Sequence, residues 1–275
     1  MPHLTTSATP TTDLFYQDLG DGPPVVLIHG WPLSHRMWES QVTALTGAGF
    51  RCIAYDRRGF GESERATGGY DYDTFASDLN DLLTHLDLQR VTLAGFSMGG
   101  GEVARYIGRY GEGRIARTML LGAVPPFFLK TADNPDGADG SVFDGMIAGM
   151  IADRLGFLDQ FFPNFYNADT WAAGAHADLI AFSKWMAWGA SPLGTRACIT
   201  AFGTTDFRGD LAKFTVPTLI VHGDADRIVP LDISGRKSHA LIQGSRLEII
   251  PGAPHGFAAT HAATLNALMI DFLRG

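Results

Sequence analysis

The sequence is poor in cysteine, has no long apolar run and carries fewer basic than acidic side chains. Its two cysteines, Cys52 and Cys198, lie far apart and lack the spacing of metal ligands. No stretch of 18 apolar residues is present, so no membrane-spanning helix is expected. A formal net charge of −8 argues against nucleic acid and anionic membrane surfaces as partners.

We also expect no secretory signal in the first twelve residues. They contain neither a positively charged region nor an apolar segment. We therefore expect a polar, partly mobile N-terminal tail, a cytoplasmic location and reduced cysteines buried in the core. With 275 residues and 45% hydrophobic content, the chain is long enough for one extended α/β domain or for a core with an inserted subdomain.

Short apolar runs alternate with helical patterns along most of the chain. Strands are predicted at 13–19, 25–28, 52–55, 91–94, 115–121, 217–222 and 247–250. Helices are predicted at 37–48, 72–86, 102–110, 232–241 and 258–273. This alternation predicts βαβ units and a largely parallel sheet.

The alternation stops at Pro125 and Pro126. From there to about residue 213 the sequence has no strand-like run, but it has several helical segments rich in Phe, Trp and Met. We therefore predict a core formed by residues 1–124 and 211–275, and a helical cap formed by residues 125–210. An insertion at this place is typical of a lid over a site.

A Gly-x-Ser-x-Gly pentapeptide, residues 95–99, lies between a predicted strand and a predicted helix. A sharp strand-to-helix turn of this kind holds the central serine in a strained conformation and exposes its oxygen at the end of the strand. A glycine-rich turn without chemistry is the alternative, but the strand before it and the helix after it favour Ser97 as a nucleophile.

A serine nucleophile needs a base and a carboxylate that orients the base. His255 follows the last predicted strand and is the best candidate for the base, whereas His29, His222 and His261 are better explained by structural or surface roles. Two carboxylates, Asp224 and Asp226, follow the strand at 217–222, and position favours Asp226. The order Ser, Asp, His differs from that of chymotrypsin and subtilisin.

Two main-chain N–H groups are needed to stabilise the oxyanion. The residue after the nucleophile, Met98, is expected to supply one of them. The loop that begins at His29 follows the strand at 25–28, and it is expected to supply the other from Trp31. Gly30 permits the close approach that this geometry requires.

Six segments together resemble the cofactor-free (non-haem) haloperoxidases and arylesterases of the α/β-hydrolase fold, also called perhydrolases. These segments are HGWPLS (29–34), YDRRGFGES (55–63), GFSMGG (95–100), TDFR (205–208), HGDADRIVP (222–230) and APHGF (253–257). The resemblance extends over nearly the whole chain. It implies a mostly parallel eight-stranded sheet with helices on both faces and a helical cap.

The resemblance places the catalytic triad on Ser97, Asp226 and His255, and the oxyanion donors on Trp31 and Met98. It implies hydrolysis of small carboxylic esters through an acyl-serine, without a cofactor or metal. It also implies perhydrolysis, in which hydrogen peroxide replaces water and a peracid forms that then oxidises halide. Pro32 is the variant associated with perhydrolysis, because its carbonyl is placed to accept a hydrogen bond from peroxide.

The acyl pocket is expected to be small and apolar. Its predicted lining residues, with Pro32, are Trp31, Phe128, Phe161, Phe162, Phe202, Ile228 and Val229. The alternative for each aromatic residue of this set is that it only packs the cap against the core.

Two other functions stay open. The same acyl-enzyme chemistry serves a lactonase or a γ-lactamase, and some α/β-hydrolase chains lose catalysis and bind ligands only. The expected partners are a small ester or carboxylic acid with water or hydrogen peroxide. The resemblance also allows a homo-oligomer, for which the sequence indicates no interface.

Overall fold

An eight-stranded sheet forms the centre of the computed structural model, which describes residues 2–172, 174 and 176–275. The strands are β1 (His3–Thr5), β2 (Asp13–Leu19), β3 (Pro24–Ile28), β4 (Arg51–Tyr55), β5 (Val91–Phe96), β6 (Ile115–Leu121), β7 (Thr218–Gly223) and β8 (Arg246–Ile250). Their order is β1-β2-β4-β3-β5-β6-β7-β8. β1 and β2 are antiparallel to their neighbours, and β3 to β8 are parallel. The predicted mostly parallel sheet is confirmed.

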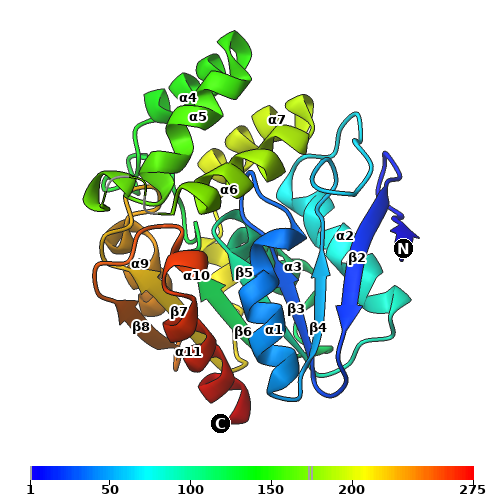
Figure 1. The fold of residues 1–275 in the computed structure, drawn as a ribbon. Coiled ribbons are helices and arrows are strands. Elements are labelled where there is room, and N and C mark those ends of the chain that lie inside the picture. Colours follow the sequence, from blue (N-terminus) through cyan, green and yellow to red (C-terminus); the bar gives the residue numbers. More distant parts are fainter. Residues whose placement is uncertain (1, 173, 175) are drawn as a thin grey trace.

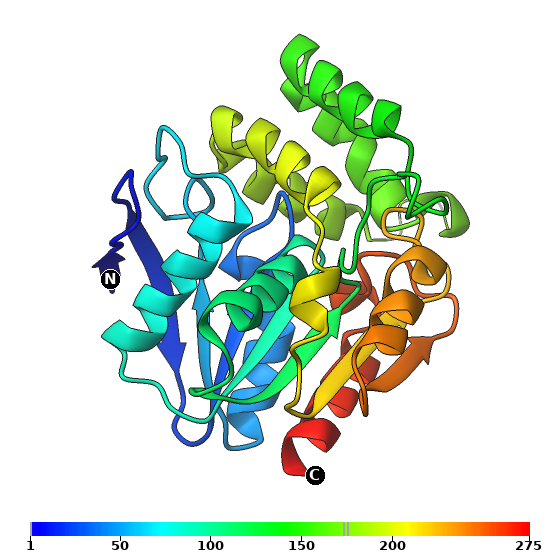
Figure 2. The same cartoon turned by 180° about the vertical axis from the view of Figure 1, so that it is seen from behind.

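Helices cover both faces of this sheet (Figures 1 and 2). The core helices are α1 (Glu39–Gly47), α2 (Tyr72–His85), α3 (Met98–Tyr110), α8 (Arg208–Leu211), α9 (Gly235–Leu241), α10 (Phe257–Thr260) and α11 (Ala262–Arg274), with the 3-10 turns η1 (His35–Trp38) and η3 (Leu231–Ile233). α1 packs against α11 on one face, whereas α2, α3 and α8 pack together on the other.

Four further helices lie above the carboxyl ends of the parallel strands (Figure 1). They are α4 (Gly140–Ala152), α5 (Arg154–Phe165), α6 (Ala177–Gly189) and α7 (Pro192–Thr204), with the 3-10 turn η2 (Ala168–Thr170). All of them belong to the segment 125–210, in which the sequence predicts helices only. Below, "cap" denotes α4 to α7 with η2.

The central strands are apolar because both of their faces are covered. Every residue of β5 and β7 is buried, as is typical of parallel strands between two helical layers. α2 shows the contrasting pattern of a surface helix, with one buried stripe that includes Phe75, Leu79 and Leu82. Its first turn is capped by Asp71, whose side chain accepts a hydrogen bond from the Thr74 N–H.

Several local predictions differ from the structure; the helix predicted at 232–241, for example, is divided at Ser234 into η3 and α9. The N-terminal segment, expected to be a polar tail, contains β1, which pairs with β2. The helix predicted at 37–48 begins earlier, as the 3-10 turn η1, where Ser34 accepts a hydrogen bond from Arg36 N–H. The helix predicted at 258–273 is divided into α10 and α11 because His261 has non-helical dihedral angles. Each difference depends on contacts or caps that periodicity does not encode.

Cys52 and Cys198 are buried and form no disulfide. Burial raises the pKa of both thiols to about 12.

Within the described part of the chain, no helix combines the length and the apolar character that crossing a bilayer would require.

Candidate active site

Ser97 occupies the turn between β5 and α3. It is a non-glycine residue with φ 54° and ψ −119°, a combination that costs free energy and persists only where the surroundings enforce it. Gly95 and Gly99 make the turn feasible: a Cβ atom at Gly95 would collide with the carbonyl of Gly99, and one at Gly99 with the carbonyl of Ile28. The two glycines therefore allow the sharp turn that presents the Ser97 hydroxyl at the end of β5.

Three side chains from separate loops meet above the sheet. His255 Nε2 lies 2.9 Å from Ser97 Oγ, and His255 Nδ1 lies 2.6 Å from Asp226 Oδ2. The loops follow β5, β7 and β8, whose carboxyl ends lie at the same edge of the sheet. Since a carboxylate only accepts hydrogen bonds, Nδ1 carries the proton and Nε2 is left to accept the proton of the serine hydroxyl.

Asp226 is held as a charged acceptor. Its Oδ1 accepts hydrogen bonds from the N–H groups of Ile228 (2.9 Å) and Val229 (2.8 Å). Burial alone would raise the pKa of Asp226, but attraction to His255 and hydrogen bonds from His222 and His255 hold that pKa well below its ordinary value. A carboxylate of this kind fixes the orientation of the His255 ring.

The other candidates from the sequence lie elsewhere. Asp224 is exposed, and its Oδ1 accepts a hydrogen bond from the Gly252 N–H at 2.6 Å. His261 lies at the junction of α10 and α11, with its Nδ1 next to the Thr260 hydroxyl. His222 is buried below Asp226, with its Nε2 2.8 Å from the carbonyl of Val229. Of the two carboxylates, only Asp226 contacts His255.

The two predicted oxyanion donors flank the serine. Met98 is the first residue of α3, so its N–H has no intrahelical acceptor. Among the described residues, no hydrogen bond uses the N–H of Trp31 either. Each residue is anchored by a second contact: Tyr72 donates its hydroxyl proton to the carbonyl of Met98 (3.0 Å), and the Trp31 indole donates to the carbonyl of Thr195 (2.9 Å). Both N–H groups are therefore free to donate to an oxyanion.

His29 braces the loop that carries Trp31. Its Nδ1 donates to the carbonyl of Gly30 (2.9 Å), and its Nε2 accepts from the N–H of Arg57 (3.0 Å). The Arg57 guanidinium also donates to the carbonyl of His29 (2.9 Å) and to Glu102 (2.8 Å). Burial, and then the charge of Arg57, lower the pKa of His29 to about 3. His29 is thus a neutral structural residue, as expected.

An apolar cavity of about 240 Å³ lies over Ser97 and His255. Its wall contains six of the eight residues predicted to bind substrate: Trp31, Phe128, Phe161, Phe202, Ile228 and Val229. Pro32 and Phe162 are not part of the wall. Phe162 is fully buried and packs against Phe161 and Phe165 instead, because successive residues of a helix point in different directions.

The wall also contains residues that the sequence did not indicate. They are Val124, Val142, Phe143, Met146, Phe157, Asn164 and Arg227. Three of them belong to α4. Because this helix is apolar on most sides, its residue pattern does not indicate which side faces the serine. At the rim, Arg227 forms an ion pair with Asp169 of η2 (2.8 Å).

No set of three or more His, Cys, Asp or Glu side chains is arranged to hold a metal ion in residues 2–172, 174 and 176–275. The chemistry that the described groups can supply is proton transfer by His255, attack by Ser97 and stabilisation of an oxyanion by main-chain N–H groups.

Comparison with known proteins gives a consistent result. Residues 23–262 match the family model described as the alpha/beta hydrolase fold. The chain is 46% identical to a non-heme chloroperoxidase of Kitasatospora aureofaciens, over 95% of this chain and 96% of that protein. It is 38% identical to a bifunctional esterase/perhydrolase of Acinetobacter calcoaceticus, over 95% and 96% of the two chains.

A solved structure is similar over the full length. The crystal structure of a bromoperoxidase from Bacillus anthracis superposes with a TM-score of 0.95 at 50% sequence identity, covering 100% of both chains. The chain therefore belongs to the α/β-hydrolase fold family and, within it, to the group of non-heme haloperoxidases and related esterases.

Proposed function

We propose that this chain is a serine hydrolase that cleaves small carboxylic esters, aryl esters included, and that it also forms peracids with hydrogen peroxide. The observation that carries the proposal is the continuous chain of hydrogen bonds from Ser97 through His255 to Asp226, with distances of 2.9 and 2.6 Å. The relatives named as non-heme chloroperoxidase and as esterase/perhydrolase support both parts of it.

Acylation uses the groups already described. Ser97 Oγ bonds to the ester carbonyl carbon while its proton moves to His255 Nε2. The carbonyl oxygen becomes an oxyanion, which the N–H groups of Trp31 and Met98 stabilise. The bond to the leaving group then breaks, and His255 returns the proton to the departing alkoxide or phenoxide. The products are an alcohol or phenol and an acyl-Ser97.

Deacylation follows the same reaction steps with a second nucleophile. Water loses a proton to His255 and attacks the acyl carbon, which releases the carboxylic acid and restores Ser97. Hydrogen peroxide in the place of water gives a peracid. The peracid then oxidises halide in solution, so the enzyme is active in a haloperoxidase assay. For this branch we assign to the Pro32 carbonyl the role of accepting a hydrogen bond from peroxide.

The cavity supports a small apolar acyl group. It is lined mainly by aromatic and aliphatic side chains, and cap helices α4, α5 and α7 supply about half of them. On this view residues 125–210 form a cap over a core made of 1–124 and 211–275. Because this lining is mainly apolar, an apolar acyl chain gains free energy by leaving water for the cavity.

The test pairs two assays on one metal-free preparation. They are the hydrolysis of p-nitrophenyl acetate and the bromination of monochlorodimedone in acetate with hydrogen peroxide. Ser97→Ala is expected to lower both rates roughly 10⁴- to 10⁶-fold, and Ser245→Ala, a control elsewhere on the chain, is expected to change neither. Hydrolysis without bromination would contradict the perhydrolase part.

Covalent labelling separates the enzyme from a binding module. A fluorophosphonate is expected to label the wild-type protein rapidly and to leave Ser97→Ala unlabelled. Absence of both activities and of labelling would contradict the serine-hydrolase proposal. Hydrolysis of lactones or γ-lactams in preference to aryl esters would keep the mechanism and replace the substrate class.

A further inference from the structure

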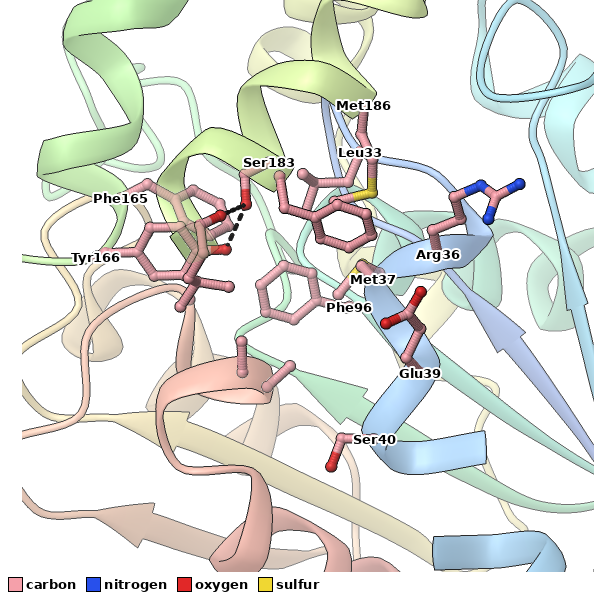
Figure 3. Close-up of a pocket in the computed structure, with 15 residues that line it drawn as sticks. Leu33, Arg36, Met37, Glu39, Ser40, Phe96, Phe165, Tyr166, Ser183 and Met186 are labelled. Carbon is pink, nitrogen blue, oxygen red and sulfur yellow. Dashed lines mark hydrogen bonds between the residues drawn. The ribbon is translucent and has the colours of Figure 1, made fainter. Parts of the chain in front are cut away.

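A second cavity, of about 220 Å³, lies between the cap and the core on the other side of His255 (Figure 3). α6, η1 with the start of α1, and α10 contribute most of its wall. Its walls are mainly apolar and include the rings of Phe96, Phe165, Tyr166 and Phe182. It shares no lining residue with the cavity over Ser97.

Two of these rings connect the second cavity to the catalytic histidine. The ring centroids of Phe96 and Phe165 lie 5.0 and 4.9 Å from that of His255. The carbonyl of Phe165 also accepts a hydrogen bond from the N–H of Gly256, the residue after His255. Any molecule in the second cavity therefore contacts the side chains that hold the imidazole in place.

The buried end of the cavity presents an unused acceptor. The Ser183 hydroxyl donates its one proton to the carbonyl of Leu179 (2.9 Å), so in the bond between Ser183 and Tyr166 (2.8 Å) the tyrosine must be the donor. Burial raises the pKa of Tyr166 to about 12, which keeps this proton in place. The phenol oxygen of Tyr166 is then left to accept a hydrogen bond from a ligand.

The rim also favours a hydrogen-bond donor. Among the described residues, no hydrogen bond or ion pair reaches the Glu39 carboxylate, which is exposed at the rim. The Arg36 guanidinium donates to Glu62 (2.8 Å) and lies 5.6 Å from the Trp185 ring centroid. Figure 3 shows that it points away from Phe96 and Tyr166. A carboxylate ligand would thus meet acceptors rather than free cations.

We infer that the second cavity binds a neutral aromatic alcohol, a phenol or a benzyl-type alcohol, with its ring among the aromatic side chains and its hydroxyl donating to Tyr166. Size supports this, since an apolar cavity of about 150 Å³ already accepts benzene. An ammonium group at the buried end, beside Tyr166, is disfavoured because one phenol oxygen does not compensate for the desolvation of a buried charge.

Binding at this place changes the rate of the chemistry rather than access to the serine. The ligand contacts Phe96 and Phe165 but leaves the cavity over Ser97 open. We therefore expect the bound alcohol to inhibit ester hydrolysis non-competitively with respect to the ester. This consequence rests on the proposed function, because the released alcohol or phenol of an aryl ester belongs to the same class of compound. The binding itself is independent of that function.

The experiment is a ¹⁹F NMR titration with 4-fluorophenol. Before the titration, Ser97 is labelled with a phosphonyl group, which occupies the cavity over Ser97. One saturable site is expected, and 4-fluoroanisole and 4-fluorobenzoate, which have no hydroxyl donor, are expected to bind at least fivefold more weakly. Equal binding of 4-fluoroanisole would overturn the role of Tyr166, and no saturable binding of 4-fluorophenol would overturn the site.

Two substitutions locate the bound ligand. Leu179→Trp and Ala259→Trp, from opposite sides of the wall, each fill the cavity and are expected to weaken binding at least tenfold. Leu193→Trp, on the exposed surface of α7, makes a similar change outside the cavity and is expected to leave binding unchanged. Unchanged binding in both filled variants would place the ligand elsewhere and overturn the inference.

The two proposals fail in different ways. If Ser97 resists phosphonylation, the proposed function is contradicted, and the titration of the unmodified chain with the same three tryptophan variants still decides the second cavity. If Ser97 reacts but 4-fluorophenol does not bind, only the second cavity is contradicted.

Discussion

The indole N–H of Trp31 donates a hydrogen bond to the carbonyl of Thr195, with 2.9 Å between the two heavy atoms. Thr195 belongs to α7 of the cap, whereas Trp31 belongs to the loop after β3. The Trp31 ring also packs edge-on against Phe161 and Phe202 of the cap, at centroid distances of 5.2 and 5.7 Å. The cap therefore positions a residue whose main-chain N–H is a proposed oxyanion donor.

Trp31→Phe is expected to lower kcat for ester hydrolysis roughly 10- to 100-fold, with a smaller change in KM. The ring contacts persist, but the bond to Thr195 is lost, and a small displacement of an oxyanion donor weakens stabilisation of the transition state. Steady-state kinetics measure the two constants. Trp188→Phe, on the exposed surface of α6, is the control. Wild-type kinetics in Trp31→Phe would contradict the idea that the cap positions the oxyanion donor.

Asp226→Asn is expected to lower kcat roughly 10⁴-fold, because an amide does not hold the imidazole in the tautomer that accepts the serine proton. Asp224→Asn, two residues away, should lower it less than about tenfold, since Asp224 contacts the N–H of Gly252 rather than His255. Comparable losses in the two variants would contradict the assignment of Asp226.

Glu102→Ala is expected to lower the free energy of unfolding by about 3–5 kcal/mol. It leaves the guanidinium of Arg57 buried without its carboxylate, and an uncompensated buried charge is costly. Tyr55 also loses a hydrogen-bond partner. Urea unfolding measures the change. As a control, Glu62→Ala breaks the partly exposed pair with Arg36 and should lower the free energy of unfolding by about 0–1 kcal/mol. Similar losses in the two variants would contradict this reasoning.

His29 is expected to make stability depend on pH. Its pKa is about 3 in the folded chain and about 6.5 when unfolded, so the unfolded state binds more protons between these values. Stability therefore falls as the pH is lowered through this range. Between pH 7 and pH 5 the contribution of His29 amounts to roughly 2 kcal/mol.

Urea unfolding at several pH values tests this expectation. His29→Gln removes the titrating group, so its stability should change less between pH 7 and pH 5 than that of the wild type. His239→Gln, which replaces an exposed histidine of α9, should retain the wild-type dependence. Parallel curves for the wild type and His29→Gln would contradict the low pKa of His29.

Much of the core could be predicted because its signals are local. β3 and β5 are short apolar runs, and α2 has a clear buried stripe, so their types follow from periodicity. The turn at Ser97 was also recognisable, since two glycines flank a serine between a strand and a helix. Parallel strands place their carboxyl ends together, and this alone brings the loops of Asp226 and His255 near Ser97.

The sequence by itself therefore determined the strands, the nucleophile turn and a short set of candidate partners. Only the tertiary structure decided the distances that join Asp226, His255 and Ser97, why Phe161 lines the cavity while Phe162 does not, and that Phe96 and Phe165 line a second cavity next to His255. The physical reason is that these features depend on how the cap helices rotate and pack against the core. Helices such as α4, which are apolar on most sides, do not encode that rotation in their own residues.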